Sequence, residues 1–247
     1  QMVLLPVLTL MLIAVIQPHP ALAAGMLLVA ACPGGNVSNY AVHLSKANAP
    51  LSVLLTTFST LAAAFTTPFV FKQGQNVLTS LTRSQTTFSI DFFSMFLSIV
   101  QLILVPLILG MLLRQWQPTF TAKIIPTVKR VSLVIFIAFI LFAVAGNLEN
   151  IRQHLHRVFL IVMVHNGLAL ALGYYFPKWM GRSTQDARTI SIETGIQNSG
   201  LALILIFNFF NGNGGMALIA AWWSVWHLVS SFVLALYWKR HPVAVSQ

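Results

Sequence analysis

Charged residues are scarce in this chain: Asp, Glu, Lys and Arg together make up 7% of its 247 residues, whereas hydrophobic residues make up 57%. Soluble globular domains carry about 25% charged residues, so this composition excludes a water-soluble fold. The mean hydropathy of +0.81 agrees with that exclusion. The single cysteine, Cys32, excludes a disulfide framework, a cysteine-based zinc site and an iron–sulfur cluster within the chain.

Acidic residues are the scarcest charged type, with four Asp and Glu against fourteen Lys and Arg, which gives a formal net charge of +10. The basic residues stand singly between apolar runs, which is typical of loops beside a bilayer and not of a nucleic-acid-binding surface. Ten of them fall on one side of the predicted spans and four on the other. The larger set is Lys46, Arg114, Lys123, Lys129, Arg130, Lys178, Arg182, Arg188, Lys239 and Arg240, and the smaller set is Lys72, Arg83, Arg152 and Arg157. Unless this split is due to chance, the positive-inside rule predicts a multi-pass protein of the cytoplasmic (inner) membrane with a cytoplasmic C-terminus.

Long apolar runs fill most of the chain, and a bilayer-spanning helix needs about 20 apolar residues. The runs predict an all-α polytopic membrane protein that leaves no room for a soluble domain. The expected spans are residues 1–16, 21–45, 49–71, 88–114, 128–146, 156–177, 187–211 and 215–238. The first run is short and starts directly at Gln1, so we expect it to be incomplete.

Two of the eight spans contain interruptions that bring Gly, Pro and polar side chains to mid-span. Residues 33–39 (PGGNVSN) interrupt the second span, and residues 193–200 (ETGIQNSG) interrupt the seventh. Non-helical backbone is tolerated at membrane depth only where it lines protein or a water-filled cavity. The interrupted spans are five apart and cross the membrane in opposite directions, as an inverted repeat of five spans predicts. If the broken helix is fourth in each repeat, the intact protein has ten spans, and two spans and part of a third precede Gln1.

Glu193 is the only acidic residue that we place inside a span, because Asp91, Glu149 and Asp186 fall in or beside loops. An ionised carboxylate at membrane depth is costly unless a cation or a proton compensates it, so such an acid is functional by default. The structural alternative is a protonated Glu or one that is paired with Lys or Arg. A local ion pair is disfavoured, because no basic residue occurs between residues 188 and 239.

Oxygen-bearing side chains gather around Glu193 in both breaks and on the span after the first break. They are Gln197, Asn198 and Ser199, then Ser38 and Asn39, then Ser52, Thr56 and Thr57. Hard oxygen ligands with one full negative charge suit a monovalent cation better than Ca²⁺ or a transition metal. Ser52 and Thr56 are four apart and share a helical face. Both residues could equally serve packing or bond to the i−4 carbonyl, which is the role we expect for Ser59 and Thr60.

The half-helix N-termini at the two breaks present positive dipole ends and free N–H groups, so an organic anion is the expected cargo. His165, which precedes Asn166, and His227 are the two mid-span histidines. A lone histidine in a membrane helix most often makes an interhelical hydrogen bond and less often contacts substrate.

Several motifs of this chain occur together in a characteristic order. They are CPGGNVSN (32–39), LSVLLTTFST (51–60) with TTP (66–68), VHNG (164–167), SIETGIQNSGLAL (191–203) and SVWH (224–227). Together they resemble one family, the bile acid:sodium symporters, and its bacterial members in particular, and the resemblance covers essentially all 247 residues. It implies ten helices in two inverted repeats, divided into a panel domain and a core domain in which the two broken helices cross. Residues 1–71, with the broken helix 21–45, and residues 156–238, with the broken helix 187–211, would belong to the core, and residues 88–146 to the panel.

The resemblance also implies two sodium ions behind the crossing. Carried over by position, the first site is Ser38, Asn39, Ser52, Thr56 and Glu193. The second is Gln1, Glu193, Thr194, Ile196 and Gln197, with Thr194 and Ile196 acting through backbone carbonyls. Substrate contacts are expected from Asn36, Asn198 and His227. Two departures fall on the substrate side: Asn36-Val37 replaces the frequent Thr-Ala, and Leu228 replaces the Asn that often follows the histidine.

We therefore expect a secondary active transporter that couples sodium to the movement of an organic anion, a bile acid or a small carboxylate, by alternating access. Its expected surroundings are the lipid bilayer, with no obligate protein partner and no nucleic acid. Proton coupling through Glu193 is the alternative mechanism. An intramembrane enzyme is less favoured, because the sequence has no HExxH, GxSxG or paired-carboxylate arrangement. A passive channel would need rings of polar groups along a pore.

Overall fold

The computed structural model describes the backbone of residues 1–82, 91–145 and 148–243, and the side chains of these residues except 82, 136, 139–140, 142–145 and 148–155. This part of the chain is helical, with no named strand, which confirms the predicted all-α class. Four of its helices are long and apolar enough to cross a bilayer: Ala49–Leu81, Phe92–Trp116, His156–Trp179 and Gly214–Arg240. Arg83 lies outside the described residues, as do the side chains of Glu149 and Arg152, so the predictions on these three stay predictions.

Helix α2 (Pro20–Ala31) lies at the centre of the fold. Its sequence, PALAAGMLLVAA, is apolar on every side, and residues 23–31 are buried. The helices around it are α1 (Leu4–Ile16), α4 (Ala49–Thr82) and α11 (Gly214–Arg240). A helix that is hydrophobic all round belongs in a core, so α2 provides the fixed support from which the first break begins.

Both predicted interrupted spans are pairs of helices. Helix α2 is followed by α3 (Val37–Leu44), and α9 (Thr184–Gly195) is followed by α10 (Ser199–Phe209). The breaks are shorter than the sequence suggested, because only residues 32–36 and 196–198 are non-helical. Ser38 and Asn39 already lie in the first turn of α3. Glu193 lies in the last turn of α9, where the Ile196 N–H still donates to the Ile192 carbonyl at 2.9 Å.

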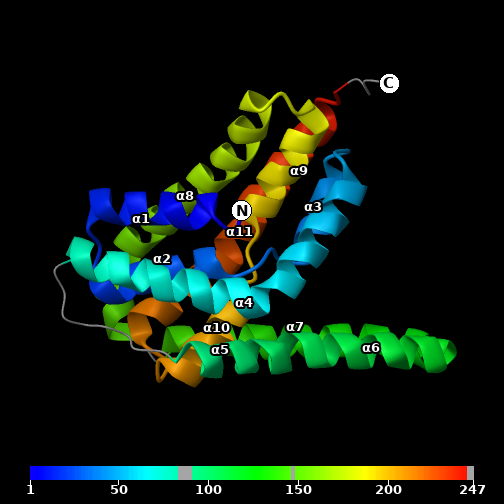
Figure 1. The fold of residues 1–247 in the computed structure, drawn as a ribbon, viewed down its shortest axis with the longest axis horizontal. Helices are drawn as coiled ribbons and strands as arrows, with labels where there is room; N and C mark the ends of the chain where they lie inside the picture. The colour runs from blue at the N-terminus through cyan, green and yellow to red at the C-terminus, as the bar shows by residue number, and fades with distance from the viewer. Residues whose placement is uncertain (83–90, 146–147, 244–247) are drawn as a thin grey trace.

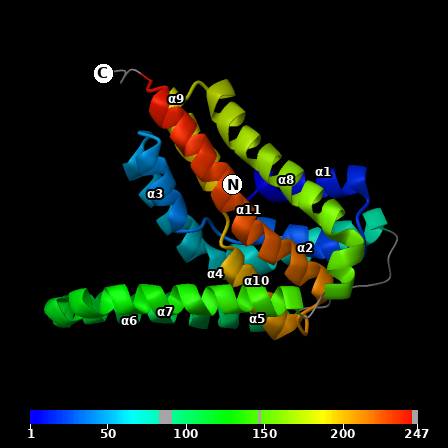
Figure 2. The same cartoon turned by 180° about the vertical axis from the view of Figure 1, so that it is seen from behind.

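Helix α8 (Leu148–Trp179) packs against α9 through a glycine. A Cβ added at Gly173 would lie 2.7 Å from the Cα of Ser191, so a larger residue would push the two helices apart. Figures 1 and 2 show the α8–α9 turn, the outer end of α3 and the C-terminal end of α11 at the same end of the molecule. Arg188 lies at this end but is buried rather than in a loop, and its guanidinium donates to the carbonyls of Trp238 at 3.3 Å and His241 at 2.8 Å.

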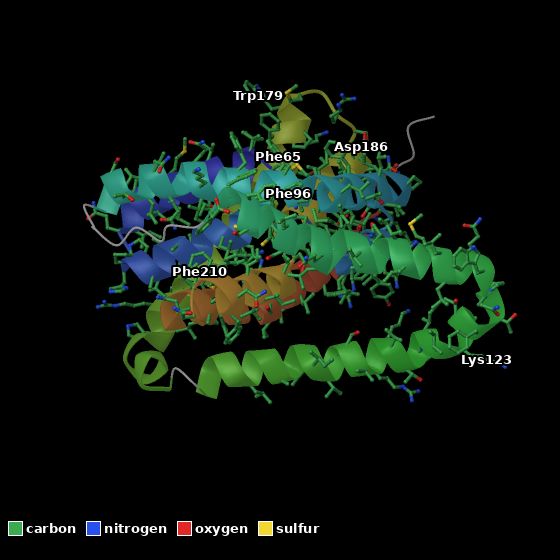
Figure 3. The ribbon with its side chains drawn as sticks, turned by 60° about the horizontal axis from the view of Figure 1, so that its bottom comes forward. Phe65, Phe96, Lys123, Trp179, Asp186 and Phe210 are labelled. Atoms are coloured by element: carbon green, nitrogen blue, oxygen red, sulfur yellow. The ribbon has the colours of Figure 1, made fainter. Side chains whose placement is uncertain are left out.

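A long helical hairpin extends from this assembly (Figures 1 and 3). Its first arm is α5 (Phe92–Ile99), a π-helical turn η1 (Val100–Leu104) and α6 (Val105–Trp116), and α7 (Pro118–Ala145) returns beside it. The connection is much shorter than the predicted stretch between spans 88–114 and 128–146, because a proline that suits a helix start opens α7. Lys123 therefore lies on a helix near the tip of the hairpin.

The start of α5 is held by a capping side chain and by an aromatic contact to α4. Asp91, which we predicted just after a loop, accepts hydrogen bonds from the Ser94 backbone N–H at 2.8 Å and hydroxyl at 2.9 Å. These bonds hold the pKa of the Asp91 carboxyl below its usual value. The next residue, Phe92, packs on α4, with its ring centroid 5.7 Å from that of Phe65. Within α5, the centroids of Phe92 and Phe96 are 6.4 Å apart, and Figure 3 shows Phe65 and Phe96 close together.

Candidate cation site at the helix crossing

The two breaks meet backbone to backbone at the centre of the molecule. Gly34 and Gln197 form an isolated antiparallel bridge. Beside it, the Gly35 N–H donates to the Ile196 carbonyl at 3.0 Å, and the Asn198 N–H donates to the Pro33 carbonyl at 2.8 Å. Helix ends leave backbone groups that hydrocarbon cannot satisfy, so each break supplies the partners that the other lacks.

Gly34 allows this close approach. A Cβ added there would lie 3.2 Å from Oε2 of Glu193 and 3.3 Å from Nε2 of Gln1. Its backbone N–H donates to the hydroxyl of Ser59 at 3.3 Å. That hydroxyl in turn donates to the carbonyl of Thr56 at 3.0 Å. Ser59 therefore bonds within its own helix, to the i−3 carbonyl and not to the expected i−4 carbonyl, and supports the break as well.

Glu193 stands at the centre of the crossing with 1% of its surface exposed. Its Oε1 accepts hydrogen bonds from the hydroxyl of Ser38 at 2.7 Å and from the hydroxyl of Ser52. Its Oε2 accepts one from the hydroxyl of Thr56 at 2.9 Å. The structure thus brings together a carboxylate of α9, a hydroxyl of α3 and two hydroxyls from one face of α4, whereas Thr57 is exposed on another face of α4.

Asn39 completes this first set and leaves it with an excess of acceptors. Its Oδ1 lies 2.8 Å from the Ser52 hydroxyl and 3.4 Å from the Thr56 hydroxyl. Each hydroxyl carries one proton, yet that of Ser52 faces both Asn39 Oδ1 and Glu193 Oε1. The Thr56 hydroxyl likewise faces Glu193 Oε2 and the carbonyl of Ser52, the latter at 3.0 Å. The oxygens therefore offer more lone pairs than the hydroxyl protons can fill, and such a cluster attracts a cation.

The second predicted set is also brought together, on the side of the break that faces α1. The Nε2 of Gln1 donates to Oε1 of Gln197 at 3.1 Å, and Nε2 of Gln197 donates to the carbonyl of Thr194 at 2.8 Å. The carbonyl of Ile196 accepts from the other break. Because Oε2 of Glu193 and Nε2 of Gln1 flank the same glycine, the two sets adjoin at Glu193.

The three predicted substrate residues are less closely connected. Asn36 is exposed and precedes α3, and Asn198 precedes α10, where its Oδ1 accepts from the Leu201 N–H at 3.0 Å. His227 is buried on α11, and among the described residues its Nδ1 has no hydrogen-bond partner. The structure places both asparagines at the crossing, but among the described hydrogen bonds none joins them to His227.

Two residues that support the breaks were not predicted from the sequence to do so. The Thr67 hydroxyl donates at 2.8 Å to the carbonyl of Ala31, the last residue of α2. Asn166 of α8 donates from Nδ2 to the carbonyl of Gly195, the last residue of α9, also at 2.8 Å. A polar side chain inside an apolar run was the available signal in both cases. His165 forms the interhelical bond expected of it, with 2.8 Å between its Nε2 and the Thr9 hydroxyl.

The donor atoms at the crossing are hydroxyl, amide and carboxylate oxygens. In the described part of the chain, no group of three or more His, Cys, Asp and Glu side chains converges on a common point. Oxygen donors with one carboxylate suit a hard cation of low charge.

Comparison with known proteins places the chain in a family. The profile of the sodium bile acid symporter family matches residues 1–154. The chain belongs to the sodium bile acid symporter family. The resemblance drawn from the motifs is thereby confirmed.

Individual members of the sodium bile acid symporter family align along most of this chain. It is 34% identical over 219 residues to the uncharacterized sodium-dependent transporter YocS of Bacillus subtilis (strain 168), which covers 89% of this chain and 65% of that protein. It is 34% identical over 220 residues to the probable sodium/metabolite cotransporter BASS1, chloroplastic, of Oryza sativa subsp. japonica (89% and 52%). The BASS1 protein of Arabidopsis thaliana is 31% identical over 221 residues (90% and 53%). The chain thus spans between about half and two thirds of the length of these relatives, which are named as transporters.

Proposed function

We propose that this protein is a secondary transporter of the cytoplasmic membrane that couples sodium ions to the movement of an organic anion by alternating access. The observation that supports this proposal most strongly is the buried carboxylate of Glu193. It lies among hydroxyl and amide oxygens whose lone pairs outnumber the hydroxyl protons that could fill them. The first sodium ion would bind Ser38, Asn39, Ser52, Thr56 and Glu193. The family membership and the names of the relatives support sodium as the cation.

A second sodium ion would bind Gln1, Glu193, Thr194, Ile196 and Gln197. Because the two sets adjoin at Glu193, one carboxylate would balance part of the charge of both ions. The loss of Glu193 would therefore impair both sites together. Two sodium ions with one monovalent anion would carry a net charge of +1 across the membrane in each cycle.

The substrate would be a bile acid or a small carboxylate that binds on the opposite side of the crossing. Asn36 and Asn198 each stand at the start of a half-helix, where amide groups and the helix dipole favour an anion. In the described structure the side chain of Asn36 makes no capping bond to α3, so its amide is available to a ligand. His227 would provide a third contact from α11.

Coupling would follow from the paired backbones of the two breaks. Sodium on one side would fix the pairing of Gly35 with Ile196 and of Pro33 with Asn198, and so hold Asn36 and Asn198 in position. For equilibrium binding this coupling is reciprocal, so the anion tightens sodium by the factor by which sodium tightens the anion. The two parts that move against each other would be a core of residues 1–71 and 156–238 and a panel of residues 88–146. Two inverted repeats would build both parts. The C-terminus would be cytoplasmic.

The test is uptake of labelled organic anions into proteoliposomes that contain the intact protein. A panel of bile acids, pantoate-like acids and other small carboxylates is offered with an inward sodium gradient, and with choline at equal ionic strength as the control. We expect at least one anion to accumulate with sodium only, and a protonophore not to lower this uptake. Uptake that needs a proton gradient instead would favour the alternative of proton coupling over sodium coupling, and the absence of any gradient-driven accumulation would contradict a transporter.

A further inference from the structure

Asn166 belongs to neither proposed sodium site, yet both ends of its amide are engaged. It lies on α8 with 0% of its surface exposed. Its Nδ2 donates to the carbonyl of Gly195 at 2.8 Å, and its Oδ1 accepts from the hydroxyl of Ser230 at 2.5 Å. One side chain thereby joins the end of α9 to the middle of α11.

The carbonyl that Asn166 holds has lost its helical partner. In a continuous helix the Ser199 N–H would donate to the carbonyl of Gly195, but here it donates to the carbonyl of Gln197 at 2.9 Å. A buried carbonyl without a donor is costly in a membrane protein. Asn166 supplies the missing donor from a neighbouring helix.

Gly195 is the middle of three consecutive residues whose carbonyls each have a different donor. Thr194 accepts from the side chain of Gln197 at 2.8 Å, and Ile196 accepts from the backbone of Gly35 at 3.0 Å. These two donors belong to the breaks themselves, whereas Asn166 comes from outside both. Because the peptide group is planar, holding the Gly195 carbonyl also sets the orientation of the peptide that joins Gly195 to Ile196.

We propose that Asn166, held in place by Ser230, is a positioning residue for the second sodium site. By fixing the Gly195 peptide it aims the flanking carbonyls of Thr194 and Ile196 toward the ion, as partners behind metal ligands do. The inference rests on the proposed sodium-coupled function. It adds a residue of α8 and a residue of α11 to the determinants of sodium affinity, although neither touches the ion.

The experiment is a sodium chloride titration of the thermal unfolding of the purified intact protein, with choline chloride as the ionic-strength control. Asn166→Leu keeps a similar side-chain volume and removes both hydrogen bonds. We expect it to raise the sodium concentration for half-maximal stabilisation about tenfold or more, in line with the effect of substitutions behind metal ligands. Ser230→Ala should produce a smaller shift in the same direction, and Ser230→Thr, which keeps the hydroxyl, should respond like the parent protein.

Two matched controls separate positioning from general stability. Ser224→Ala removes another buried hydroxyl of α11, one that bonds to the Ala220 carbonyl of its own helix at 2.8 Å. Thr9→Val removes the buried bond to His165, the neighbour of Asn166 on α8. Thr9→Val should lower the unfolding temperature, and neither control should change the sodium concentration for half-maximal stabilisation.

The outcomes distinguish this inference from the proposed function. If the parent protein shows no sodium response beyond that of choline, the proposed function fails and the inference falls with it. If the parent responds and both Asn166→Leu and Ser230→Ala respond at the same sodium concentration, the inference is overturned while the proposed function stands. An equal shift in Thr9→Val would also overturn it. If Asn166→Leu does not fold, the comparison of Ser230→Ala with Ser230→Thr decides the question.

Discussion

Replacing Glu193 by Gln removes the full negative charge at the crossing and keeps the side-chain volume. The carboxylate is 1% exposed and accepts hydrogen bonds from the hydroxyls of α3 and α4. An ionised carboxylate at this depth opposes folding when no cation balances it. We therefore expect Glu193→Gln to unfold in choline chloride at the same temperature as the parent protein or at a higher one.

The same substitution should weaken sodium binding, although it does not lower stability in choline chloride. Insertion measurements show that an uncompensated charge at membrane depth costs about 3 kcal/mol. A factor of ten in binding corresponds to about 1.4 kcal/mol, so the loss of the carboxylate should weaken sodium about 100-fold. At a sodium concentration of about 100 times the Kd of a site, the parent gains about 2.7 kcal/mol of stability from that site, whereas the variant gains about 0.4 kcal/mol.

The assay is thermal unfolding of the purified protein in matched sodium chloride and choline chloride series. Asp186→Asn is the control, because it removes an acidic charge from the first turn of the same helix, where Asp186 Oδ1 accepts from Asn48 Nδ2 at 2.8 Å. This control should keep the full sodium response. A sodium-dependent rise in unfolding temperature that is as large in Glu193→Gln as in the parent would refute the placement of the cation at this carboxylate.

The remaining predictions concern the two sides of the crossing and its close approach. The double variant Ser52→Ala with Thr56→Ala should weaken sodium binding more than anion binding, and Asn198→Ala should do the reverse. Calorimetric titrations that find the binding of both ligands equally impaired in both variants would indicate one mixed pocket. Gly34→Ala should weaken the sodium response, because the added methyl group would lie 3.2 Å from the Glu193 carboxylate. Gly167→Ala is its control, since an added Cβ there meets nothing within 4 Å and should raise helix stability by up to about 1 kcal/mol. If Gly34→Ala left the sodium concentration for half-maximal stabilisation unchanged, the result would argue against the crossing as the cation site.

The sequence was most informative where the covalent structure of a residue determines the backbone conformation. A proline with two glycines cannot continue a helix at low cost, so the break after Cys32 was predictable. The four-residue spacing of Ser52 and Thr56 fixed their common face, and the structure confirms that both point to one carboxylate. The cost of burying an ionised carboxylate at membrane depth singled out Glu193 from the sequence alone.

The extent of the breaks could not be read from the residues alone. Helical hydrogen bonds persist through Gly195 because the last N–H groups of α9 still find partners within the helix, whereas composition suggested that the break began at Glu193. The role of Asn166 depends on which helix faces the end of α9, and that is a tertiary contact. The burial of Arg188 has the same origin, since its acceptors are carbonyls some 50 residues away in the chain.

The most direct test of sodium coupling at the crossing measures the entry of sodium-22 and of a labelled organic anion together in proteoliposomes. We expect that two sodium ions enter with each monovalent anion, that an inside-negative potential accelerates both, and that Glu193→Gln abolishes this linked entry. Anion entry that proceeds in choline without sodium, or that stays linked to sodium in Glu193→Gln, would contradict sodium coupling at the crossing.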